Sequence, residues 1–155
     1  MKLISRSPGE TMKIGRAIAA GSKKSDIICL FGNLGSGKTV LTRGIASGLG
    51  VKKDNIISPT FVLIRQYKGK LPVYHFDLYR LQGTQDILAL GYEEYFYNEG
   101  ISIIEWADRL CCLMPKEFLR VDLEVTGENK RSLEFSAFGS RSAEWLKDIR
   151  SRLTK

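Results

Sequence analysis

Residues 32–39 read GNLGSGKT, a complete G-x-x-x-x-G-K-[ST] loop that decides the fold. The apolar, β-prone residues 26–31 precede this loop, and residues 40–49 follow it without a proline, as a predicted helix that ends at Gly50. A strand, a glycine-rich loop and a helix in this order form a cradle for a phosphate group, because backbone N–H groups and the positive end of the helix dipole point at one spot. A glycine turn that binds nothing is the simpler interpretation, and the correct flanks count against it.

The residue types in the loop predict a bound nucleoside triphosphate with Mg²⁺. Lys38 is expected to contact the β- and γ-phosphates, and the Thr39 hydroxyl is expected to take one position on the metal ion. The other loop residues that we expect to contact the nucleotide are Asn33, Leu34, Gly35, Ser36 and Gly37.

Length and composition are those of an ordinary globular protein. With 155 residues, 43% of them hydrophobic and 26% charged, the chain is most simply one domain, residues 1–155. No apolar stretch is long enough to cross a bilayer, and residues 1–6 lack the apolar core of a signal peptide. We therefore expect a cytoplasmic protein that binds no membrane. The three cysteines are expected to be reduced thiols without zinc, since no C-x-x-C spacing exists and His75 is the only histidine.

The net charge of +7 has two interpretations. A basic surface attracts nucleic acid or an acidic partner, whereas the solvated face of an amphipathic helix is basic without binding either. The last fifteen residues illustrate the second case, because five Lys/Arg there are interleaved with apolar residues at helical spacing. They predict a terminal helix.

The remaining segments carry helix and strand signals in turn. Residues 2–6 are a predicted strand, and Ser7-Pro8-Gly9-Glu10 predicts a helix to about Gly21, since serine caps it, proline opens it and glutamate completes a capping box. Further predicted elements are hairpin strands 61–67 and 71–76, a helical segment 84–98 broken at Gly91, strand 101–104, hairpin strands 118–126 and 131–138, and a loop at 55–60 that contains Pro59. We therefore predict an α/β fold: a three-layer α/β/α sandwich of the P-loop NTPase type, whose mixed sheet has a parallel part and antiparallel hairpin additions.

A phosphate loop needs a carboxylate near the metal ion before it can act in an NTPase. Glu105 follows the predicted strand 101–104 and Asp77 follows the predicted strand 71–76, so both are expected at the edge of the sheet where ligands bind. Their spacing does not decide which of the two holds Mg²⁺.

Three other residues have a structural and a functional interpretation. Thr60 lies where many P-loop proteins sense the γ-phosphate, and a simple turn fits the sequence equally well. His75, a lone histidine in a strand, is more simply a core residue or a support for the site than a catalyst. Trp106 is expected either in the core or against the nucleotide.

Four motifs in this order resemble the TsaE (YjeE-type) family. They are GNLGSGKT with LTRG at 41–44, SPTF at 58–61, YHFDLYR at 74–80 and IEW at 104–106. Their order and spacing match across roughly residues 8–138, and the HFDLYR block with the EW pair is far more discriminating than the loop. The resemblance implies a small bacterial Mg²⁺-dependent ATPase required for threonylcarbamoyladenosine at adenosine 37 of tRNA. It also implies action with the TsaD–TsaB complex, which carries out the transfer to tRNA.

The resemblance assigns roles by position. It makes Thr39 and Glu105 the Mg²⁺ site and Lys38 the phosphate clamp. Asp77 becomes the residue needed for ATP hydrolysis, by orienting water or the water shell of the metal ion, and Thr60 lies in the loop that senses the γ-phosphate. The catalytic residues expected on this basis are Lys38, Thr60 and Asp77.

The adenine side of the site rests on a looser match to the family. Arg131 matches a basic position near the adenine, and the segment Pro8–Thr11, with Thr11 itself, would border the base. The chain departs from the commonest family pattern at Asn33, where Asp is usual, and in its basic charge. Neither departure removes a phosphate or metal ligand.

Three other functions fit parts of the pattern. A GTPase would need N-K-x-D, and residues 129–132 read NKRS, so this function is disfavoured. A small-molecule kinase shares the loop but would need an acceptor pocket and an arginine-rich lid, for which Arg80 and Arg109 are candidates without a compact lid segment. A regulatory module that uses nucleotide only to hold its shape is the third alternative.

Overall fold

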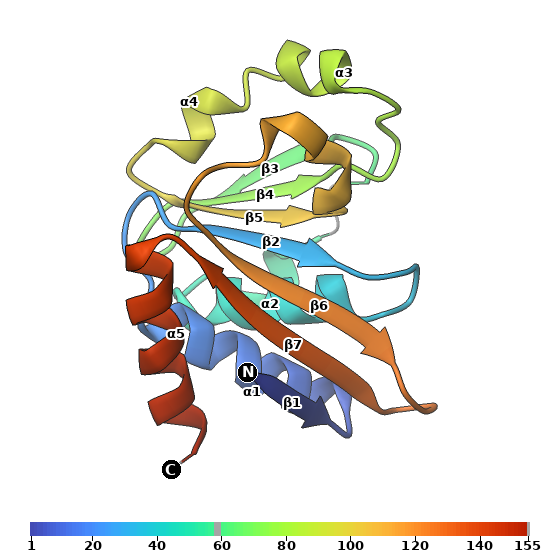
Figure 1. Ribbon diagram of the computed structural model, residues 1–155, viewed down its shortest axis with the longest axis vertical. Helices are drawn as coiled ribbons and strands as arrows, with labels where there is room; N and C mark the ends of the chain where they lie inside the picture. The colour runs from blue at the N-terminus through green and yellow to red at the C-terminus, as the bar shows by residue number, and fades with distance from the viewer. Residues whose placement is uncertain (58–59, 155) are drawn as a thin grey trace.

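A seven-stranded mixed sheet forms the centre of the computed structural model, which describes residues 1–57 and 60–154 (Figure 1). The strands are β1 (Lys2–Ser5), β2 (Ile27–Phe31), β3 (Ile64–Tyr67), β4 (Val73–Asp77), β5 (Ile101–Glu105), β6 (Phe118–Val125) and β7 (Arg131–Phe138), in the order β1-β7-β6-β2-β5-β4-β3. The four neighbours β6, β2, β5 and β4 run parallel, while β3, β7 and β1 are antiparallel additions. The predicted mixed sheet is confirmed, with the refinement that β6 of the second hairpin belongs to the parallel part.

Helices cover both faces of this sheet, so the predicted three layers are confirmed. The helical segments are α1 (Pro8–Ala20), α2 (Lys38–Gly48), η1 (Lys53–Asn55), α3 (Thr84–Ala89), α4 (Glu93–Phe96), the 3₁₀ segment η2 (Ala107–Leu113) and α5 (Ser140–Leu153). One apolar cluster joins α1, α2 and α5 to the sheet, and it includes Ile45 and Trp145. A second cluster on the opposite face includes Ile87 of α3, Phe96 of α4 and Leu110 of η2. No helix in the described ranges 1–57 and 60–154 is long and apolar enough to span a membrane.

The first helix begins where its capping signal predicts. The Ser7 hydroxyl accepts a hydrogen bond from the Glu10 N–H at 3.1 Å, and the Glu10 carboxylate accepts one from the Arg6 N–H at 2.7 Å. The first bond satisfies a backbone donor that the first turn leaves unpaired, and the second holds the residue just before the cap. They also fix the direction in which the chain enters α1, and therefore the place of its first turn.

Two local predictions need correction. The predicted strand 61–67 begins only at Ile64, because Leu63 has a φ of +67°, a left-handed value that ends an extended strand. Phe61 and Val62 are exposed instead of paired in the sheet. The 3₁₀ segment η2 was not predicted at all, and the Ser58–Pro59 part of the predicted loop lies outside the described residues. The break at Gly91 is confirmed, since its φ of +66° separates α3 from α4.

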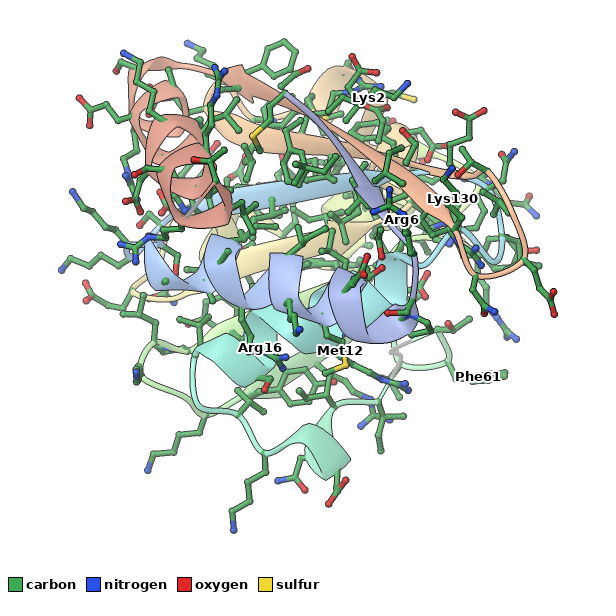
Figure 2. All side chains as sticks on the ribbon, turned by 90° about the horizontal axis from the view of Figure 1, so that it is seen from below. Lys2, Arg6, Met12, Arg16, Phe61 and Lys130 are labelled. Atoms are coloured by element: carbon green, nitrogen blue, oxygen red, sulfur yellow. The ribbon has the colours of Figure 1, made fainter. Side chains whose placement is uncertain are left out.

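The two helices beside the phosphate loop approach each other through glycines. A Cβ on Gly15 of α1 would lie 2.6 Å from the Leu41 carbonyl oxygen and 2.8 Å from the Gly44 Cα of α2. Both neighbours are backbone atoms, which cannot move aside as a side chain does. Met12 and Arg16 lie along the same seam (Figure 2). Glycine is therefore required here by close approach, and the contact fixes α1 against α2.

Gly15→Ala is expected to destabilise the fold by about 1–3 kcal/mol, because the new methyl group forces the two backbones apart. Chemical denaturation measures this change. Gly9→Ala is the matched control in the same helix, because a Cβ there meets only the Ser7 hydroxyl at an ordinary 3.7 Å. The control should be neutral or slightly stabilising, since alanine is the better helix former. Equal stability of the two variants would contradict the close-packing argument.

Candidate nucleotide-binding site

The loop of residues 32–37 leads from β2 into α2 through three left-handed glycines. Gly32, Gly35 and Gly37 have φ values of +146°, +79° and +103°, a region that favours glycine. A Cβ on Gly32 would lie 2.4 Å from the Leu123 carbonyl oxygen, so no other residue fits there. No side chain caps the first turn of α2, which begins at Lys38. Its N–H groups are the kind of cradle in which an anion binds.

The Lys38 ammonium lies folded across this loop and is nearly buried. It donates to the Gly32 carbonyl and, at 3.0 Å, to the Asn33 carbonyl. It also lies 3.9 Å from the centroid of the Trp106 ring, in a cation–π contact. Burial lowers the pKa of the Lys38 ammonium, and the Glu105 carboxylate partly offsets this shift.

Two carboxylates stand side by side at the end of the parallel strands. Glu105 of β5 pairs in register with Asp77 of β4, and both are nearly buried. The Thr39 hydroxyl donates to Glu105 Oε2 at 3.0 Å. The Thr60 hydroxyl donates to Asp77 Oδ2 at 2.7 Å, and the Tyr79 N–H donates to Asp77 Oδ1 at 3.0 Å. A hydroxyl and two carboxylates form the all-oxygen donor set that suits Mg²⁺.

A cavity of about 440 Å³ gathers most of the predicted residues. The predicted residues that line it are Thr11, Leu34, Gly35, Ser36, Gly37, Lys38, Thr39, Thr60, Asp77, Glu105, Trp106 and Arg131. Asn33 does not line it; this residue is exposed, and its carbonyl accepts a hydrogen bond from Lys38. The lining residues that the sequence did not predict are Ser7, Val40, Tyr79 and Asn129. Tyr79 lies inside the YHFDLYR block, so this block was the available signal, whereas Asn129 reaches the cavity only through the folding of the β6–β7 hairpin.

Arg131 connects the β6–β7 turn to the phosphate loop. Its guanidinium donates to the Gly35 carbonyl at 3.3 Å and to three carbonyls of the turn: those of Gly127, Glu128 and Lys130. On the other side of the cavity the Tyr79 and Trp106 rings pack with centroids 4.8 Å apart. These rings provide an apolar wall of the type on which a nucleobase stacks.

Both the sequence and the fold of this chain resemble those of known proteins. The family model described as "Threonylcarbamoyl adenosine biosynthesis protein TsaE" matches residues 5–133. The chain is 39% identical over 136 residues to the protein named tRNA threonylcarbamoyladenosine biosynthesis protein TsaE of Bacillus subtilis, covering 87% of this chain and 84% of that one. It is 34% identical over 133 residues to the protein of the same name from Treponema pallidum, covering 86% and 98%. A crystal structure described as Bacillus subtilis YdiB superposes with a TM-score of 0.83 at 34% identity, covering 100% of this chain and 96% of that chain.

Lys38→Ala is expected to weaken nucleotide binding about ten- to hundredfold, because it removes a charge-assisted contact to phosphate and leaves the backbone cradle intact. Isothermal titration calorimetry with ADP and with ATP measures the affinity. Lys13→Ala, an exposed lysine on α1, is the control and should bind as the unaltered protein does. Unchanged nucleotide affinity in the Lys38 variant would contradict a contact between this lysine and the phosphates.

Proposed function

The chain belongs to the TsaE family, and we propose that it binds ATP with Mg²⁺ and hydrolyses the ATP in support of threonylcarbamoyladenosine formation on tRNA. One observation carries the proposal. A single cavity is lined by the phosphate loop, by the Thr39–Glu105 pair and by the Thr60–Asp77 pair. These are the parts that ATP hydrolysis requires: a phosphate cradle, a metal site and a group that acts on water.

Nucleotide binding relies on the loop and on the lysine. The backbone N–H groups of residues 32–37 and of the first turn of α2 bind the phosphate oxygens. Lys38 exchanges its bonds to the Gly32 and Asn33 carbonyls for bonds to the β- and γ-phosphates. Thr39 and Glu105 hold Mg²⁺, which when bound neutralises charge on the phosphates. The Trp106 and Tyr79 rings form one wall of the base site.

Hydrolysis relies on the second carboxylate. Asp77 accepts hydrogen bonds from the Thr60 hydroxyl and the Tyr79 N–H, which fix the carboxylate at the wall of the cavity. A carboxylate fixed there would accept a proton from a water that attacks the γ-phosphate, or orient the water shell of the metal ion. Thr60 helps to hold Asp77 in place through its hydrogen bond.

The rim of the cavity suggests where a protein partner binds. Leu34 is 76% exposed and Phe61 is 81% exposed, and Val62 beside Phe61 is exposed too. Figure 2 shows Phe61 projecting from the end of the molecule where the phosphate loop lies. Apolar side chains exposed together at a functional site mark a contact surface. We propose this rim as the contact with the TsaD–TsaB complex, in the cytoplasm.

Charge suggests a place for tRNA. Residues 1–76 contain thirteen Lys/Arg and only three Asp/Glu, so the positive charge is concentrated in this half of the chain. Lys13 and Arg16 of α1 and Arg43 of α2 are exposed there. Phosphate backbones bind such surfaces in a strongly salt-dependent manner. We propose that tRNA acts on the ATPase either at this face or indirectly, through the TsaD–TsaB complex.

The deciding experiment measures phosphate release from ATP by the protein alone, with the TsaD–TsaB complex, and with the complex and tRNA. We expect slow release alone and faster release with the complex. Hydrolysis that the complex leaves unchanged would favour a regulatory module, and phosphate found on a small acceptor instead of in water would favour a kinase. Binding of tRNA to the protein alone, weakening steeply with salt, separates direct from indirect contact.

Asp77→Asn is expected to separate binding from turnover. The amide keeps the size of the carboxylate but cannot accept the water proton, so partner-stimulated hydrolysis should fall at least about a hundredfold while ATP affinity stays within a fewfold. Single-turnover hydrolysis and calorimetric titration measure the two quantities. Asp86→Asn, an exposed carboxylate on α3, is the control. Normal stimulated turnover in the Asp77 variant would move the catalytic role to Thr60.

A further inference from the structure

We propose that His75 is a positioning residue, which orients the buried Glu105 carboxylate so that one of its oxygens faces the metal position beside Thr39. This inference rests on the proposed function, in which Glu105 and Thr39 hold Mg²⁺. The His75 side chain is fully buried and does not line the cavity. It cannot touch the nucleotide, so any role in the site acts through a neighbour.

The neighbour is Glu105, and His75 is its shortest contact. His75 Nε2 lies 2.7 Å from Glu105 Oε1, while Glu105 Oε2 accepts from the Thr39 hydroxyl at 3.0 Å. The Thr42 hydroxyl also lies near Oε1, at 3.3 Å, but it is closer to the Lys38 carbonyl, at 3.0 Å. A hydroxyl has one proton, and threonine in a helix commonly donates it to the carbonyl four residues earlier. His75 is therefore the donor that holds Oε1, which leaves Oε2 turned toward Thr39.

Strand geometry explains how His75 reaches this carboxylate. Side chains two residues apart on a strand point to the same face, so His75 lies directly behind Asp77 on β4. Asp77 pairs in register with Glu105, and His75 pairs with Ile103, two residues deeper on β5. The imidazole thus approaches Glu105 from inside the sheet, on the side away from the cavity. In this position it orients the carboxylate without occupying space that a ligand needs.

The second ring nitrogen supports this assignment. His75 Nδ1 is buried and has no hydrogen-bond partner among the described residues. Because an ionised carboxylate can only accept, the Nε2 atom carries the proton that the Glu105 bond uses. If this side chain only filled the core, leucine would do so without leaving a polar atom unpaired. Unpaired buried polar atoms are uncommon, so packing alone does not explain a histidine at this position. The ring contact with Tyr67, at 6.2 Å between centroids, holds the imidazole but gives Nδ1 no partner.

Three variants separate a positioning role from a packing role. The side-chain amide nitrogen of His75→Gln reaches the place of Nε2, that of His75→Asn reaches only the place of Nδ1, and His75→Leu has no donor. Calorimetric titration with ADP, once with Mg²⁺ and once with EDTA, gives the gain in affinity due to the metal ion. We expect this gain to fall about ten- to hundredfold in the Leu and Asn variants and to be largely restored in the Gln variant. Affinity in EDTA should change less than about threefold.

Two outcomes overturn the inference while leaving the proposed metal site intact: an unchanged metal-dependent gain in the Leu variant, or equal losses in the Gln and Asn variants. If the Leu variant does not fold, the comparison of Gln with Asn decides alone, with thermal melting as the control for each. In a Glu105→Gln background, His75→Leu should lower the metal-dependent gain in ADP affinity by less than about a further twofold. The reason is that the residue through which His75 acts is already altered. If the unaltered protein binds ADP equally tightly with Mg²⁺ and with EDTA, the proposed metal site is wrong, and the inference that rests on it is wrong too.

Discussion

Charged groups at the end of the parallel strands are nearly buried, and each must find partners inside the protein. Glu105 and Asp77 stand in register on adjacent strands, and like charges this close repel unless donors surround them. The donors come from different parts of the chain: Thr39 from the start of α2, Thr60 from the loop before β3, and the Tyr79 N–H from the segment after β4. The Lys38 ammonium of the phosphate loop adds a positive charge nearby. The arrangement of the site follows from this requirement, because each donor fixes one segment against the sheet. The same oxygens that accept these donors are the ones that suit a hard cation.

The scaffold accounts for why these charges meet at one edge. Four parallel strands direct their carboxyl ends to the same side, and the segment after each strand reaches the same space (Figure 1). Helix α1 completes the rim, since the Ser7–Glu10 cap places its first turn at the cavity. The hairpin β6–β7 contributes from the opposite side through Arg131, whose bond to the Gly35 carbonyl ties the hairpin to the loop.

What could be predicted from the sequence was local. The phosphate loop, the cap at Ser7, the break at Gly91 and the hairpin at 118–138 each depend on neighbours within a few residues, and each was predicted correctly. The start of β3 was predicted wrongly, because no glycine or proline marks the left-handed conformation at Leu63. The Leu63 carbonyl instead accepts a hydrogen bond from the Asp77 N–H, which lies far along the chain. The pairing of β6 with β2 and the partners of Glu105 were also beyond local reasoning, since they join segments far apart in the chain.

The hydrogen bond between Thr60 and Asp77 joins the interior of the site to the outer surface. Elsewhere at the site, α1 and α2 pack backbone to backbone at Gly15 and Gly44. The exposed Phe61 directly follows Thr60, whose hydroxyl is bonded to the nearly buried Asp77 carboxylate. Under the proposed function, a shift of that carboxylate would reach the outer surface over the length of one residue. A protein bound at Phe61 would then contact a segment that is hydrogen-bonded directly to the proposed catalytic group.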